Sequence, residues 1–213
     1  MSPDPGSQPP VLNIANVLTV LRLALVPVFL AALFADGGEA VGWRVVAFVI
    51  FAVAAFTDRV DGQIARRRGL VTDFGKIADP IADKALIGSA LVSLSLLAEL
   101  AWWVTVVVIA RELGVTLLRF WVIRHGVIPA SRGGKAKTLA QSLAIGLYVL
   151  PLPGPAHLVA VVVLGVAVVL TVVTGVDYVV RAVRLRREGM RMQQAALLNP
   201  SLLRPGVVPG NRS

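Results

Sequence analysis

Four aspartates gather where two long apolar segments of the chain meet, between Thr57 and Leu86. Asp58 and Asp61 lie near the end of one segment, and Asp79 and Asp83 lie near the start of the next. Spacings of three and four residues place each pair on one face of a helix. Both pairs lie about 6 to 12 Å inside the expected polar boundary, at about 1.5 Å per residue. We therefore expect the four carboxylates to meet at one level.

Clustered carboxylates near lipid repel one another and are costly to desolvate, unless they are protonated or bound to cations. Mg²⁺ and Mn²⁺ accept oxygen ligands of this kind and also hold phosphates, so we expect two divalent ions that clamp a diphosphate. Gly62, Ala65 and Gly75 are small enough to let a ligand approach the backbone, and Arg66 can complement phosphate charge. Each residue alone could serve in an ion pair, in helix packing or as an anchor, but the combined spacing favours a site.

The segments that carry these residues are too apolar for an ordinary soluble domain. Of 213 residues, 56% are hydrophobic and 15% are charged, and several segments reach the roughly 20 residues that cross a bilayer. We expect an all-α membrane protein with six transmembrane helices. Their approximate ranges are 17–35, 41–68, 77–98, 102–123, from after Lys137 to 151, and 158–180. The third helix begins either before Pro80 or at Asp79.

Flanking segments complete the expected organisation. Residues 1–12 form a disordered tail, 13–187 the catalytic domain, and 188–213 a flexible tail that follows a basic helical extension. Lys and Arg cluster after the even-numbered spans, with Arg44 as an exception, so both termini and the site should face the cytoplasm from a multi-pass cell membrane. The net charge of +9 is divided among loops, which argues against nucleic acid, and the absence of cysteine excludes thiolate chemistry.

The aspartate-rich stretch resembles the CDP-alcohol phosphotransferase family, whose pattern is DxxDGxxAR, a short gap and GxxxDxxxD. All eight positions are matched, by Asp58, Asp61, Gly62, Ala65, Arg66, Gly75, Asp79 and Asp83. The resemblance implies the family fold of six spanning helices, a homodimer, two divalent cations (Mg²⁺ or Mn²⁺), and transfer of a phosphatidyl group from CDP-diacylglycerol with release of CMP. It also implies that the four aspartates are metal ligands and that Asp83 is the general base. The residues it assigns to CDP binding are Asp61, Gly62, Ala65, Arg66 and Gly75.

Three further segments, 13–30, 110–126 and 133–141, look like the phosphatidylglycerophosphate synthases of that family. This likeness implies glycerol 3-phosphate as the acceptor and a role in phospholipid biosynthesis. Cardiolipin synthases share the first segment and take phosphatidylglycerol, so they are the alternative. An ion transporter is a remote alternative, since its acids usually lie nearer the midplane, and a non-catalytic scaffold is disfavoured by the intact motif.

A phosphorylated acceptor needs fixed positive charge near the metals. We expect it from Arg111, Lys135 and Lys137, with Thr19 and Arg22 as weaker candidates. The two lysines could instead be membrane anchors. Arg111 could instead pair with an acid.

That acid is either Glu112 or one on another helix. Because adjacent helical residues do not face each other, we expect Arg111 and Glu112 to have different partners. Asp177 and Arg181, four residues apart, should form a structural pair. The tryptophans at span ends fit an interfacial belt; they are Trp43, Trp102, Trp103 and Trp121.

Overall fold

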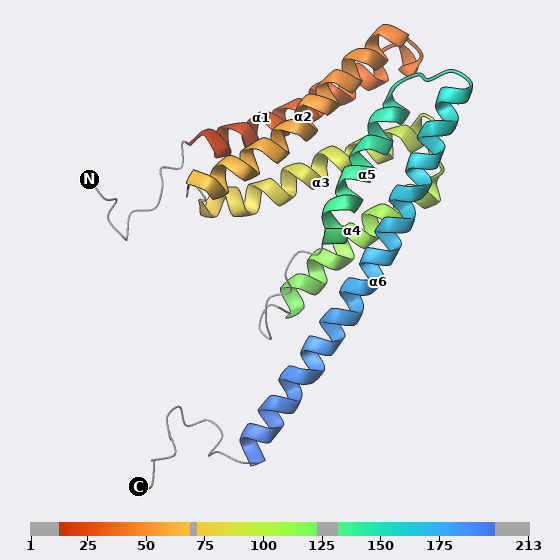
Figure 1. Cartoon of the computed structure of the whole chain (residues 1–213). Helices are drawn as coiled ribbons and strands as arrows, with labels where there is room; N and C mark the ends of the chain where they lie inside the picture. Colours follow the sequence, from red (N-terminus) through yellow and green to blue (C-terminus); the bar gives the residue numbers. More distant parts are fainter. Residues whose placement is uncertain (1–12, 69–71, 123–131, 199–213) are drawn as a thin grey trace, which may run out of the picture.

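A computed structural model describes residues 13–68, 72–122 and 132–198 of the chain, and Figure 1 shows their arrangement. Within these ranges every regular element is helical. The elements are α1 (Ile14–Phe34), η1 (Ala35–Gly38), α2 (Val41–Arg68), α3 (Asp73–Leu96), α4 (Trp102–Val122), α5 (Arg132–Val149) and α6 (Pro155–Leu198). The expected all-α class is therefore confirmed for the described part of the chain.

Local sequence explains where the first helix begins and ends. Asn13 caps α1, because its side-chain oxygen accepts a hydrogen bond of 3.0 Å from the backbone N–H of Asn16. At the far end, η1 turns the chain through left-handed residues, with φ of 53° at Asp36 and 67° at Gly37. Glycine adopts this conformation freely, and aspartate tolerates it better than most residues. The expected polar turn at 36–38 thus lies within η1.

The structure settles one helix boundary that the sequence left open and extends another helix beyond its expected range. The third helix begins at Asp73, so Pro80 lies inside α3 rather than in its first turn. α6 continues past the expected domain boundary at residue 187 and ends at Leu198. The tail that was expected from residue 188 is therefore helical as far as residue 198, and its flexibility stays a prediction. This stretch has no proline and is rich in Met, Gln, Ala and Leu, which favour a helix.

Two segments of the described chain are long and apolar enough to cross a membrane by length and composition, Asn16–Gly38 and Pro155–Arg187. Val41–Thr57 is a shorter apolar segment. The count of six spans stays a prediction. With 44 residues, α6 is about 66 Å long at about 1.5 Å per residue, more than twice the roughly 30 Å of a bilayer's hydrocarbon core.

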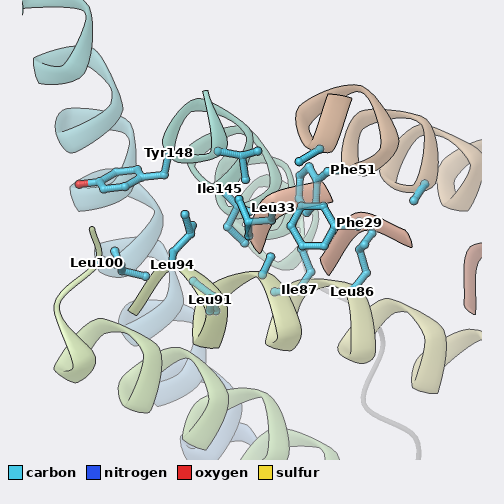
Figure 2. Packing of buried hydrophobic residues seen from close by; sticks show 14 of the residues in the cluster. Phe29, Leu33, Phe51, Leu86, Ile87, Leu91, Leu94, Leu100, Ile145 and Tyr148 are labelled. Carbon is cyan, nitrogen blue, oxygen red and sulfur yellow. The ribbon is translucent and has the colours of Figure 1, made fainter. Parts of the chain in front are cut away.

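The helices pack as two groups that meet through α5 and through a contact between α3 and α4. α1 packs against α2 and α3, α6 packs against α5 and α4, and α5 also contacts α2 and α3. The buried core is centred on α1, α2, α3 and α5, with smaller contributions from α4 and α6, and Phe29 and Phe51 meet in it with ring centroids 5.8 Å apart (Figure 2). A Cβ at Gly146 would lie 3.2 Å from Phe48 Cε2, so glycine lets α5 approach α2 closely.

Arg44, on α2, joins several helix ends through its buried guanidinium. Its two Nη atoms donate to Glu99 Oε1 and Oε2 at 2.5 and 2.6 Å, in the link between α3 and α4. Its Nε donates to the carbonyl of Val149 at 2.7 Å, and Nη2 donates to that of Tyr148 at 2.8 Å, at the end of α5. The isolated arginine among otherwise non-basic turns is therefore a structural clasp.

Polar and aromatic side chains elsewhere agree with their expected structural roles. Arg181 Nε lies 3.0 Å from Asp177 Oδ1 in an exposed pair on α6, which confirms the expected pairing. Trp43, Trp102 and Trp103 are at least half exposed at the starts of α2 and α4, as interfacial residues would be. The side chain of Trp121 lies outside the described residues.

Candidate active site

The eight motif residues lie on two consecutive helices. Asp58, Asp61, Gly62, Ala65 and Arg66 belong to the C-terminal turns of α2, and the other three belong to the first half of α3; these are Gly75, Asp79 and Asp83. The backbone thus brings both halves of the motif to one link between helices. Of the eight, Asp83 is described with its side chain, whereas the side chains of the other seven lie outside the described residues.

A buried hydrogen bond fixes this link to the start of α1. Thr72 immediately precedes α3, and its Oγ1 donates to Asn16 Oδ1 at 2.9 Å. Both residues are buried, and Asn16 is held in turn by the Asn13 cap. As Figure 1 shows, the N-terminal end of α1, the C-terminal end of α2 and the N-terminal end of α3 lie together at one end of the molecule. The start of α3, which carries two of the proposed metal ligands, is therefore held against the start of α1.

Asp83 lines a pocket between α3, α4 and α5. Other polar groups in its wall are Lys84 from α3, Glu112 from α4, and Lys137, Thr138 and Gln141 from α5. The remaining lining is mostly apolar, including Ile87, Leu91 and Val108. A half-buried carboxylate beside apolar walls and ammonium groups can accept a proton from a bound hydroxyl or ligate a hard cation.

Of the four side chains expected to ligate divalent cations, the structure describes one, and that one suits such a cation. Asp83 offers the carboxylate oxygen that Mg²⁺ and Mn²⁺ prefer. Its three expected co-ligands, Asp58, Asp61 and Asp79, have side chains outside the described ranges. Within those ranges, no three His, Cys, Asp or Glu side chains come together. Ligation by the four aspartates stays a prediction.

A cluster of charged groups adjoins the pocket where α4, α5 and α6 meet. Glu112 Oε1 accepts hydrogen bonds from Lys137 Nζ and from Arg111 Nη1, the latter at 3.1 Å. Arg111 Nη2 also donates to Thr174 Oγ1 on α6 at 2.9 Å. Lys137 is only 4% exposed, so it is not a surface anchor. Two cations share one carboxylate, which leaves the cluster with a formal charge of +1.

This cluster corrects one sequence-based expectation. Arg111 and Glu112 were expected to have different partners because adjacent Cβ atoms on a helix diverge. Each does have a further partner, Thr174 and Lys137 respectively, but the two also bond each other. The reason is length, since the arginine side chain is long enough to fold back over the helix surface to its neighbour.

The other expected acceptor residues lie elsewhere or outside the described part. Thr19 and Arg22 are fully buried on α1, and neither lines the pocket. The side chain of Lys135 is outside the described residues. Arg111 is absent from the pocket wall and reaches it through Glu112. Sequence reasoning assigned no role to Thr72, Gln141 or Thr174, because a single threonine or glutamine on an apolar helix gives no local signal.

The family model for CDP-alcohol phosphatidyltransferases matches residues 12–173, a range that contains the whole motif and the pocket. The chain belongs to this family. It is 63% identical over 172 residues to the probable phosphatidylglycerophosphate synthase of Mycobacterium tuberculosis, covering 81% of this chain and 82% of that protein. It is 38% identical over 179 residues to the CDP-diacylglycerol–glycerol-3-phosphate 3-phosphatidyltransferase of Bacillus subtilis, covering 78% and 93%. The family's members are membrane-embedded and generally depend on divalent metals.

The same enzyme of Rickettsia bellii is 35% identical over 171 residues, covering 78% of this chain and 93% of that one. These matches confirm the resemblance drawn from the aspartate motif and identify the chain as a phosphatidyltransferase.

Proposed function

We propose that this phosphatidyltransferase transfers the phosphatidyl group of CDP-diacylglycerol to glycerol 3-phosphate, giving phosphatidylglycerophosphate and CMP. The names of three similar proteins support this reaction. The observation that carries it is the pocket in which Asp83, a candidate base, shares a wall with the buried ammonium of Lys137. A reactive carboxylate and a fixed cation in one pocket suit an acceptor that bears both a hydroxyl and a phosphate.

Each motif residue has a proposed role in this reaction. Asp83 accepts the proton of the acceptor hydroxyl as its oxygen attacks the phosphorus that carries diacylglycerol, and the bond from that phosphorus to CMP breaks. Bound divalent ions would neutralise the diphosphate and the departing CMP. Their proposed ligands are Asp58, Asp61, Asp79 and Asp83. The proposed contacts to the CDP group are Asp61, Gly62, Ala65, Arg66 and Gly75.

The acceptor phosphate is proposed to bind the cations on the α4 and α5 side of the pocket. Lys137 lies in the pocket wall, and Arg111 adjoins it through Glu112. Because the cluster has a formal charge of +1, it can attract the negatively charged phosphate of the acceptor. Lys135 lies less than one turn before Lys137 on α5 and belongs to the same proposal, with Thr19 and Arg22 as weaker members.

The proposed setting is a homodimer in the cell membrane, with six spans, both termini in the cytoplasm, and the site at the cytoplasmic boundary. The apolar segments of α1 and α6 and the distribution of basic loops support it. At this boundary a lipid donor enters from the leaflet while a soluble acceptor arrives from the cytosol.

The test is CMP release by the purified full chain with Mg²⁺, CDP-diacylglycerol and a panel of acceptors. Glycerol 3-phosphate should give CMP and phosphatidylglycerophosphate in equal amounts, and Asp83→Asn should give neither. Inositol phosphate and serine serve as controls for acceptor choice. CMP release with phosphatidylglycerol and none with glycerol 3-phosphate would overturn the proposal in favour of cardiolipin synthesis.

A further inference from the structure

We propose that Glu112 is a positioning residue that holds Lys137 at the pocket for the acceptor phosphate; this inference rests on the proposed function. The roles proposed so far use the cations of this cluster and leave its carboxylate without one. Yet Glu112 is the point where the cluster's contacts converge, since its Oε1 accepts from both Lys137 and Arg111. Glu112 and Lys137 also both line the pocket that contains Asp83.

Burial makes the position of Lys137 depend on this carboxylate. The lysine side chain is 5% exposed, on a flexible four-carbon stem that has no single preferred geometry. Taking an ammonium out of water is costly unless an anion meets it. Arg111, 15% exposed, would also repel a nearby ammonium if no carboxylate neutralised the pair. Glu112, the carboxylate in direct contact with Lys137, therefore holds it in the pocket wall.

Glu112 is itself held by a second cation, Arg111. Arg111 bonds Glu112 through Nη1 and Thr174 through Nη2, so its guanidinium connects α4 to α6. Gly175 gives this guanidinium room, because a Cβ there would lie 3.0 Å from Arg111 Cγ and 3.5 Å from Nε. The contacts thus run from the Thr174 hydroxyl on α6 through Arg111 and Glu112 to Lys137. The carboxylate is fixed before any acceptor arrives.

Glu112 also has an opposite effect, because an anion near the pocket repels a phosphate. Removing its charge, however, leaves the ammonium of Lys137, which is 4% exposed, without the carboxylate that it contacts in the pocket wall. We expect the positioning effect to dominate, so neutralising Glu112 should weaken acceptor binding. If repulsion dominated, the same change would strengthen it.

The experiment compares Glu112→Gln with wild type in the full chain, varying one substrate while the other is saturating. Glutamine keeps the shape and an acceptor oxygen but removes the charge. We expect the KM for glycerol 3-phosphate to rise at least about tenfold, because one charge-assisted hydrogen bond to the acceptor phosphate is lost. The KM for CDP-diacylglycerol should change less than about twofold. Glu112→Asp, which keeps the charge, should recover part of the loss.

Two further variants separate positioning from a general structural role. Lys137→Met should raise the same KM, and the double variant with Glu112→Gln should be no worse than Lys137→Met alone, because both act through one ammonium. Asp177→Asn is the matched control, since it removes one carboxylate from the exposed ion pair on α6. It should leave both KM values unchanged.

Several outcomes would overturn the inference. These are equal changes in both KM values, a lower KM for glycerol 3-phosphate, additive effects in the double variant, or failure of both Glu112 variants to fold. Wild-type protein that releases no CMP with glycerol 3-phosphate would refute the proposed function itself, and the inference with it. Wild-type turnover with an unchanged Glu112→Gln variant would refute the inference alone.

Discussion

The Arg44 clasp allows a stability prediction that is independent of the reaction. Arg44→Met keeps the side chain's apolar stem and removes its guanidinium. The carbonyls of Tyr148 and Val149 then lose donors at 2.8 and 2.7 Å within a buried region. Each unsatisfied buried group costs about 1 to 3 kcal/mol. Glu99 is 35% exposed and can regain water, so its contribution is discounted.

The sum is a loss of about 2 to 6 kcal/mol in the free energy of unfolding. For a chain of this size, about 2 to 4 °C accompanies each kcal/mol, so the melting temperature should be roughly 4 to 24 °C lower. Arg44→Lys should fall between wild type and Arg44→Met, because lysine can pair with Glu99 but lacks the guanidinium fork.

The assay is thermal unfolding of purified protein in detergent, with Arg184→Met as the control because Arg184 is exposed on α6. Arg44 lies about 21 Å along α2 from Asp58, at about 1.5 Å per residue, so the folded variant should keep its KM values at low temperature. An Arg44→Met protein that melts within about 2 °C of wild type would refute the reasoning.

Three further predictions follow from the sites described above. Gly175→Ala should raise the KM for glycerol 3-phosphate a few fold, because the new Cβ displaces Arg111. Gly165→Ala on the same helix should leave this KM unchanged, because a Cβ there meets nothing within 4 Å, and equal effects of the two variants would contradict the prediction. Asparagine in place of Asp58, Asp61 or Asp79 should nearly abolish CMP release and weaken its dependence on Mg²⁺. Asp83→Asn should stay inactive even at saturating Mg²⁺, because an amide cannot accept the proton. Wild-type turnover in any of these variants would refute the role of that residue. A single cysteine at position 70 should react with an impermeant thiol reagent only after the cells are opened, and labelling of intact cells would contradict the topology.

Helix ends were predictable where charge or turn chemistry marks them. The sequence indicated that the second helix runs into the arginines at 66–68, where a run of three charges is unfavourable in lipid, and α2 is helical through Arg68, the last residue described before residue 72. Pro80 was ambiguous because proline fits either the first turn of a helix or, with a local cost, its interior. The continuation of α6 beyond residue 187 was missed because hydropathy identifies where lipid ends and gives no information on where a helix ends.

Contacts between distant segments were less predictable than the motif. The eight motif positions were found because their spacing is fixed within one stretch of chain. The partners of Arg44 lie 55, 104 and 105 residues away, and two of them are backbone carbonyls, which every residue carries. The sequence likewise carried no sign that Lys137 is buried against Glu112, which lies 25 residues away.

The Arg111–Glu112 bond has a consequence for how the chain is made. Thr174 follows Arg111 by 63 residues, so at about 5 to 20 residues per second the ribosome needs roughly 3 to 13 seconds to reach it. During that delay the part of α6 that carries Thr174 does not yet exist, and an arginine in a proposed span must enter the bilayer without this partner. Glu112 is synthesised immediately after Arg111 and can neutralise it from the start. Adjacency in sequence, which seemed to forbid the pair, gives this arginine a counter-ion throughout its insertion.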